Sequence, residues 1–518
     1  MSGKVVAIAF PAAPEWRDSL MRAPVLLLLF GLGLAASGCG RPAEHAAGRI
    51  AWREGDVDDA FNEAREAHKP VLLYWGAKWC PPCNLMKQTL FKDPGFIAET
   101  RNFIPVHLDG DDKDAQTWGK RFGIQGYPTV IILTPDRTEV TRLDGGSTAG
   151  ELTGVLEVAA KRTTSTEDLL SRAENPAGLS AADWRLLASF DWLDDPKHFG
   201  DQQKGAAFVA RLADAAPDPA MKRRFALTAL FMASGNADVA KLTPVQQAQV
   251  GVILPAILAS DAEVRANRQT LSYGAAPLIL GLTDPAERKT LSAQLVAALD
   301  KVAADPGVPL GDRLATANAD IALSKAANGG KATPEVLAKV RERVAMADKA
   351  ATDPQMRQAV MPDAAGLLAD AGDRPGAEKL LEAELPRSVA PYYDMVDLAE
   401  LLEKDKDDKT AIAWLKQAAD SAQGPATRVQ WAIFYSNGVM RMTPDDHAAV
   451  ATAAGAVVDA LGQNSSGYAE RTEKKVAAWS KTLHAWSAAH AGADVLARLD
   501  ARLAQACAKD GCQNALKT

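Results

Sequence analysis

The sequence predicts a protein of two parts, an α/β domain near the N-terminus and a long all-α region after it. At 518 residues, the chain is longer than one hydrophobic core usually supports, so two or more domains are expected. From residue 50 to residue 162, short β-like apolar runs alternate with amphipathic helical patterns, which is typical of an α/β domain. Residues 176–518 are rich in Ala and Leu at helical spacing, which indicates an all-α region.

Composition places the chain among ordinary globular proteins. Hydrophobic residues make up 47% of the sequence and charged residues 24%, and the formal net charge is −7. A surface that binds nucleic acid concentrates Lys and Arg, and no such stripe stands out in this sequence. We therefore expect no nucleic-acid partner.

The first 38 residues have the organisation of a secretory signal peptide. Met21 and Arg22 precede "APVLLLLFGLGLAASGC", an apolar run that is short for a membrane span and ends in small residues. Residues 1–20 lack this organisation, so Met21 is a candidate translation start. The pattern predicts export.

The end of this run, "LAASGC", resembles the lipobox of bacterial lipoproteins, although Ala36 stands where that family usually has Leu. The resemblance implies that Cys39 is lipidated and becomes the mature N-terminus, followed by a tether over residues 39–49. Gly40 in place of Asp then implies the bacterial periplasm, with the anchor in the outer membrane. Simple cleavage of the signal, leaving a spare thiol, is the alternative.

Cys80 and Cys83 are separated by two prolines in "WCPPC". A zinc site would need two more Cys or His ligands nearby, and the sequence has no second C-x-x-C and no His cluster beside this one. A purely structural disulfide would close a very short loop and stabilise little. A Cys at the start of a helix meets unpaired N–H groups and the positive end of the helix dipole, which favour the thiolate. The spacing therefore favours redox chemistry, without a metal or another cofactor.

Residues 50–162 resemble the thioredoxin family. "WCPPC" follows a hydrophobic strand pattern and opens a helix, and "GYPT" at 126–129 lies just before "VIIL", where that family has its cis-proline loop. The stretch around the cysteines is similar to the C-terminal thioredoxin domain of periplasmic transmembrane reductases. The resemblance implies that Cys80 is the attacking and more exposed thiol and that Cys83 is the resolving thiol. It also implies that the substrate is contacted by Trp79, Tyr127 and Pro128.

The sequence departs from that family beneath the cysteines. Many thioredoxins have a buried Asp six positions before the first cysteine as a proton acceptor, and this chain has Tyr74 there. The partnering Lys of the next strand aligns near Pro105. His107 on the same strand is a candidate substitute base, and a structural role is the alternative.

A polar segment over residues 163–175 is predicted to be a linker. Beyond it, "DAAGLLADAGDRPGAEKLL" from Asp363 matches "DLAELLEKDKDDKTAIAWL" from Asp397 at an offset of 34 residues. This period resembles the tetratricopeptide family, which implies a repeat domain over 176–518 that binds a protein partner. A generic Ala-rich helical array with a chance match is the alternative.

Cys507 and Cys512 lie in "ACAKDGCQN". A continuous helix would point the two side chains apart, but Gly511 can adopt the positive φ that lets the chain fold back. We predict a structural disulfide that restrains the C-terminus, with a second redox pair as the alternative. With Cys39 lipidated, the five cysteines are then all assigned.

These features predict an exported, lipid-anchored thiol–disulfide oxidoreductase that acts by dithiol–disulfide exchange on periplasmic proteins. Its partners would be proteins with disulfides or thiols and an unidentified electron donor or acceptor, and the direction of electron flow stays open. The alternative is a helical scaffold that uses the thioredoxin fold as a non-enzymatic adaptor. The intact C-x-x-C favours the enzyme, because an adaptor has no need of a second thiol.

Overall fold

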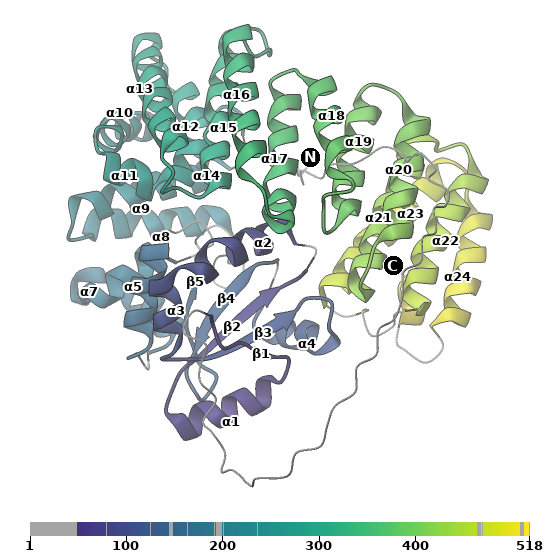
Figure 1. The fold of residues 1–518 in the computed structure, drawn as a ribbon, viewed down its shortest axis with the longest axis horizontal. Coiled ribbons are helices and arrows are strands. Elements are labelled where there is room, and N and C mark those ends of the chain that lie inside the picture. The colour runs from purple at the N-terminus through teal and green to yellow at the C-terminus, as the bar shows by residue number, and fades with distance from the viewer. Residues whose placement is uncertain are drawn as a thin grey trace, which may run out of the picture.

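The computed structural model describes residues 49–516, apart from residues 79, 125, 144–148, 163, 191, 193–198, 200, 236, 464–467, 469 and 508–511. An α/β domain lies inside an arc of helices (Figure 1). The expected signal peptide, nearly all of the expected tether, the lipidation site Cys39 and the flanking Trp79 lie outside the described residues.

The α/β domain is built on a five-stranded sheet with the order β1-β3-β2-β4-β5. Neighbouring strands are parallel between β1, β3 and β2, whereas β4 is antiparallel to both β2 and β5. The strands are β1 Arg53–Glu54, β2 Val71–Gly76, β3 Ile104–Asp109, β4 Thr129–Leu133 and β5 Glu139–Leu143.

Helices cover both faces of this sheet, because side chains alternate between the faces along each strand. In β2, Leu73 and Trp75 pack with α1 and α4, while Leu72 and Tyr74 pack with α3 and α5. Helix α2 begins after β2 and carries the cysteine motif. These helices are α1 Val57–Ala67, α2 Pro81–Gln88, α3 Pro94–Thr100, α4 Lys113–Arg121 and α5 Ala149–Ala159, with the 3₁₀ turn η1 Leu90–Lys92 after α2.

The segment 163–175, predicted to be a linker, contains helix α6 Thr166–Ala173 instead. Ser165 caps the helix by accepting a hydrogen bond from the Asp168 amide, and Leu169 and Leu170 join the core formed by α3 and α5. The helix forms because the polar residues of this segment supply an N-cap and an exposed helix face around an apolar stripe.

After α6 the chain is helical nearly to the end of the described residues, so the prediction of an α/β domain followed by an all-α region is confirmed. The longer helices are α7 Ala181–Ala188, α8 Gln202–Ala215, α9 Pro219–Ser234, α10 Pro244–Leu258, α12 Arg268–Leu280, α13 Pro285–Ala304, α15 Ala317–Ala327, α16 Pro334–Ala350, α17 Pro354–Asp370, α18 Arg374–Glu384, α19 Pro391–Lys404, α20 Asp408–Ser421, α21 Pro425–Met442, α22 His447–Gln463, α23 Glu470–Ala489 and α24 Ala493–Ala506. The short elements are α11 Asp261–Ala266, α14 Leu310–Ala315, η2 Pro176–Gly178 and η4 Cys512–Asn514.

The 34-residue match corresponds to two successive helix hairpins, α17–α18 and α19–α20. The connecting turns are equivalent, because Gly372 and Lys406 both have positive φ, at 99° and 68°. Asp373 and Asp407, which follow them, each cap the next helix through an accepted amide hydrogen bond. The helical region is therefore compatible with a tetratricopeptide-like domain.

The arc of helices contacts the α/β domain at separate places. Helix α7 packs on α5, α17 packs on α2, and α23 packs on α4. Figure 1 shows the arc passing over α2 in its middle. The helical region thus covers the helix that carries the cysteines.

Within the described part of the chain, no helix has both the length and the apolar character that crossing a membrane requires.

Candidate active site

Cys80 and Cys83 form a disulfide at the N-terminus of α2, with their Cα atoms 5.2 Å apart. Cys80 is the N-cap residue, with extended backbone angles, and its Sγ accepts a hydrogen bond from the Cys83 amide at 3.2 Å. A thiolate on Cys80 would meet the same amide and the positive end of the helix dipole. The helix start therefore favours Cys80 as the sulfur that becomes anionic.

The two prolines shape this helix start. Pro81 and Pro82 occupy the first helical positions, where the fixed φ of proline suits a helix and its missing N–H leaves no bond unmade. The first amide of the helix is therefore that of Cys83, which is directed at Cys80. The next amide, that of Asn84, is used by the Cys80 carbonyl at 3.0 Å.

Both cysteines are buried, although Cys80 was expected to be the more exposed of the two and retains slightly more accessible surface. Cys80 is 2% exposed and Cys83 0%. The cause is the helical region, because both cysteines and Ala77 pack in the same hydrophobic cluster as residues of α17 and its neighbours. The sequence pattern of one domain could not reveal that another domain covers it.

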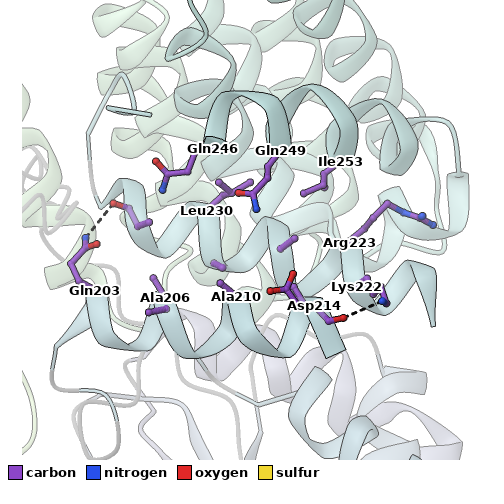
Figure 2. A pocket seen from close by; sticks show the side chains of 15 residues that line it. Gln203, Ala206, Ala210, Asp214, Lys222, Arg223, Leu230, Gln246, Gln249 and Ile253 are labelled. Carbon is purple, nitrogen blue, oxygen red and sulfur yellow. Dashed lines mark hydrogen bonds between the residues drawn. The ribbon is translucent and has the colours of Figure 1, made fainter. Parts of the chain in front are cut away.

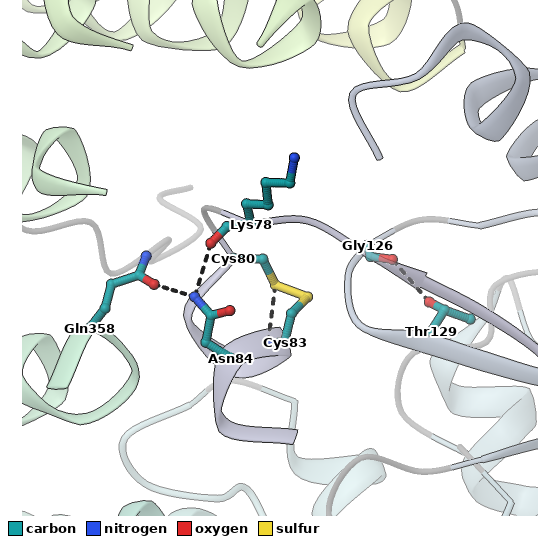
Figure 3. Close-up of a disulfide and its surroundings, with 7 residues drawn as sticks. All are labelled: Lys78, Cys80, Cys83, Asn84, Gly126, Thr129 and Gln358. Atoms are coloured by element: carbon teal, nitrogen blue, oxygen red, sulfur yellow. Dashed lines mark hydrogen bonds between the residues drawn. A yellow bond between two sulfur atoms is a disulfide. The ribbon is translucent and has the colours of Figure 1, made fainter. Parts of the chain in front are cut away.

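Three of the hydrogen-bonded contacts between the helical region and the domain involve α2 or the segment before α4, and no sequence motif pointed to them. Asn84 donates to the side chain of Gln358 in α17 and to the Lys78 carbonyl, as Figure 3 shows. One turn along α2, Gln88 donates to Gln355 at 2.7 Å.

The third contact lies beside α4. The Asp111 carboxylate accepts from the Thr427 hydroxyl at 2.9 Å and from the Thr427 amide at 3.2 Å. Thr427 is in the first turn of α21, so the carboxylate also faces the positive end of that helix. A further contact joins Arg162 to Asp183 of α7 at 2.6 Å.

The predicted cis-proline loop lies beside the disulfide, on the side away from Gln358 (Figure 3). The Tyr127–Pro128 peptide bond is cis. The Tyr127 hydroxyl donates to the Gly110 carbonyl at 3.3 Å and accepts from Gln116 at 3.1 Å. The structure thus brings Tyr127 and Pro128 to the same end of the domain as Cys80 and Cys83.

Tyr74, which replaces the acidic residue of many thioredoxins, is buried in β2. Its hydroxyl has no hydrogen-bond partner among the described residues. Burial, and to a smaller degree the charge of Asp109, raises the pKa of Tyr74. A phenol with a raised pKa keeps its proton at neutral pH and cannot accept another from Cys83. Tyr74 therefore does not take over the role of a carboxylate.

His107 is paired with Tyr74 across β2 and β3, and the two rings stack with their centroids 5.1 Å apart. Its Nδ1 lies 2.8 Å from a Glu54 carboxylate oxygen. The structure thus places His107 in hydrogen-bond contact with the edge strand. Nearby on α2, burial lowers the pKa of Lys87, while the charges of Asp109 and Glu54 oppose this shift.

A cavity of about 1050 Å³ opens between the two parts of the molecule. On one side it is lined by Pro82, Leu85 and the 126–129 loop, and on the other by residues of α12, α14 and the segment before α14. It therefore begins where α2 and the cis-proline loop meet, next to the disulfide.

A second cavity, of about 490 Å³, lies between α8, α9 and α10. Two of its polar side chains bond to backbone carbonyls of its own walls, because Lys222 donates to the Asp214 carbonyl and Gln203 to the Ala233 carbonyl (Figure 2). Its lining contains no Cys, Ser or His, and it shares no residue with the cavity beside the cysteine motif.

The second cysteine pair is also oxidised. Cys507 and Cys512 form a disulfide with Cα atoms 5.3 Å apart, at the C-terminal end of α24. Among the described residues, no cluster of His, Cys, Asp and Glu side chains has the arrangement of a metal site.

Taken together, the sheet order, the helix that begins at a C-x-x-C disulfide and the adjacent cis-proline loop define a thioredoxin-like domain. Residues 57–160 match the family model described as a thioredoxin-like domain, so this prediction is confirmed.

Relatives with curated names match the same region. The thiol:disulfide interchange protein DsbD 1 of Pseudomonas aeruginosa is 31% identical over 110 residues, which cover 20% of this chain and 19% of that protein. A thioredoxin of Thiocapsa roseopersicina is 28% identical over 87 residues, covering 17% of this chain and 91% of that protein. The protein disulfide-isomerase of Hordeum vulgare is 26% identical over 125 residues, covering 23% of each protein. The similarity to DsbD 1 and to protein disulfide-isomerase thus spans less than a quarter of each, and these findings support a thiol–disulfide oxidoreductase family.

Proposed function

We propose that this protein is an exported thiol–disulfide oxidoreductase that exchanges disulfides with protein substrates through Cys80 and Cys83. The observation that carries the proposal is the disulfide at the start of α2, in which Cys80 Sγ accepts a hydrogen bond from the Cys83 amide. A thiolate stabilised at that position is both a nucleophile and a good leaving group.

In the reducing direction, the Cys80 thiolate attacks one sulfur of a substrate disulfide. A bond forms between Cys80 and that sulfur, and the other substrate sulfur leaves as a thiolate. Cys83, after losing its proton, attacks Cys80 and releases the second substrate thiol. Two electrons have then passed to the substrate, the Cys80–Cys83 disulfide has formed, and a dithiol donor must reduce it for another turn.

In the oxidising direction the same exchange steps run in reverse, with a substrate dithiol as the electron source and a disulfide as the final acceptor. Which direction operates depends on the potentials of the partners.

We further propose that the chain is lipidated at Cys39 and anchored to the outer membrane in the bacterial periplasm, with the helical region binding a protein partner. The apolar run before Cys39 and the two helix hairpins with a 34-residue period support these proposals. Mass spectrometry of the mature N-terminus tests the anchor, and an unmodified N-terminus beyond Cys39 would contradict it.

Turnover of a protein disulfide, such as those of insulin, with a dithiol as reductant tests the central proposal. We expect turnover that requires both Cys80 and Cys83.

The competing proposal is a non-enzymatic adaptor, favoured by the nearly complete burial of both cysteines. It predicts no turnover with any disulfide and a partner complex that forms equally well without the two cysteines.

A further inference from the structure

Neither cysteine lines the interdomain cavity, but the cavity is lined by residues adjacent to them, and both cysteines are buried. α17 packs along α2, and Gln358 and Gln355 bond to two successive turns of it. The cavity meets this site at Pro82 and at Tyr127 to Thr129. A folded protein that presents a disulfide on a broad surface would collide with the helical region before reaching Cys80.

The cavity has the size for part of a polypeptide chain. At about 1050 Å³, it lies just above the range of about 300–1000 Å³ that small-molecule pockets occupy. Its lining includes the apolar side chains of Leu85, Leu310 and Met356. Such apolar walls suit the apolar side chains of an extended segment. A folded protein would keep those side chains in its own core.

The helical wall offers few uncompensated charges. The Arg268 guanidinium is buried and donates to the Asp312 carboxylate at 2.7 Å, and Gln269 donates to the other oxygen of Asp312 at 3.0 Å. Because these groups already bond to one another, they do not demand an acidic or a basic partner. The Arg313 guanidinium on the same wall donates to the Ala303 carbonyl and to the Met346 sulfur.

We propose that the helical region restricts the substrates of Cys80 and Cys83 to extended, cysteine-bearing polypeptide segments that enter through this cavity. The proposal rests on the proposed function and specifies the substrate class for the same site. The exchange is the one described above: a substrate disulfide accepts two electrons from the Cys80–Cys83 dithiol, which an external dithiol restores.

The test compares two probes that carry the same chromogenic aromatic mixed disulfide on a single cysteine. One probe is a short unstructured peptide, and the other is a rigid folded protein with that cysteine on a surface helix. The full chain, reduced beforehand, should react with the peptide at least about tenfold faster than with the folded protein after correction for each probe's reactivity with a free dithiol.

Cavity-filling variants then locate the entrance. Pro306→Trp adds an indole to an exposed position on the helical wall, and Lys92→Trp does so on the opposite wall. Val252→Trp is the matched control, because Val252 is 72% exposed on α10 and does not line the cavity. Each wall variant should slow the peptide reaction about tenfold, while the control stays within about twofold of the unmodified chain. If thermal unfolding shows that one wall variant is misfolded, the rate measured for the variant on the other wall decides whether the peptide enters through the cavity.

Similar rates for the two probes, or wall variants that behave like Val252→Trp, would overturn the restriction while leaving the oxidoreductase proposal intact. No reaction with either probe would remove the proposed function, and this inference with it.

Discussion

The two disulfides of this molecule are alike in most respects and differ in which end of a helix they occupy. Their Cα atoms are 5.2 Å and 5.3 Å apart, and all four cysteines are at most 2% exposed. Cys80 caps the N-terminus of α2, whereas Cys507 caps the C-terminus of α24. Burial and spacing therefore do not distinguish a reactive pair from a structural one.

The helix end supplies the distinction. At the start of α2, a thiolate is stabilised by the Cys83 amide and the positive end of the dipole. At the end of α24, a thiolate would face backbone carbonyls and the negative end. The reduced form of the first pair is stabilised and that of the second is not, so we expect exchange at Cys80–Cys83 only.

The largest effect should follow from replacing the attacking sulfur. Cys80→Ser should reduce turnover at least about a thousandfold, because a serine hydroxyl is not ionised at neutral pH. Cys83→Ser should instead trap the substrate on Cys80 as a mixed disulfide, visible by non-reducing electrophoresis. Trapping by Cys80→Ser, through Cys83, would mean that the roles are reversed.

Asp394, a buried acid of the helical region, tests how low the polarity of the core is around which that region packs. Burial raises the pKa of Asp394 to about 8, and neither of its carboxylate oxygens has a hydrogen-bond partner within normal geometry among the described residues. The folded state then holds a proton that the unfolded state releases near pH 4, so the free energy of unfolding falls as pH rises from about 4 to about 8.

Asp394→Asn cannot ionise, so it should flatten this pH dependence and stabilise the protein at pH 8.5 by an amount on the order of 3 kcal/mol. Denaturant unfolding of both chains at pH 5 and pH 8.5 measures it. The neighbouring Asp397, whose pKa burial also raises, should leave a residual slope. If the free energy of unfolding fell equally between pH 5 and pH 8.5 in the unmodified protein and in Asp394→Asn, the result would contradict a low-polarity core.

Removing the C-terminal disulfide should have a smaller effect and spare the chemistry. The double variant Cys507→Ser/Cys512→Ser should lose about 2 kcal/mol of stability, because the closed loop is short. Its disulfide turnover should match that of the unmodified chain. A folded double variant without turnover would place this pair in the electron path.

The smallest expected effect concerns the packing of the helical region over Cys80. Asp111→Ala combined with Gln358→Ala removes two of the hydrogen-bonded contacts that join the helical region to α2 and to the segment before α4. Alkylation of Cys80 in the reduced protein should become up to about tenfold faster, since two polar contacts of this kind together contribute about 1.5 kcal/mol. An unchanged alkylation rate would show that apolar packing alone holds the helical region over Cys80.

The sequence was most informative where local chemistry decides the structure. "WCPPC" predicted a cysteine at a helix start because proline suits the first helical turn, and the equivalent turns at Gly372 and Lys406 follow from the 34-residue match. Interactions between distant segments could not be predicted. Nothing in the sequence around Gln358 or Thr427 indicates contact with α2 or α4, because these bonds depend on the curvature of the whole helical arc.

Equilibrating the protein in dithiol–disulfide buffers of graded potential, followed by alkylation and mass spectrometry, tests the central claim most directly. It measures the reduced fraction of both cysteine pairs in one molecule. The account predicts that Cys80–Cys83 becomes reduced at a distinctly less reducing potential than Cys507–Cys512, because its thiolate is stabilised at a helix N-terminus. Reduction of Cys507–Cys512 first, or of both pairs together, would contradict it.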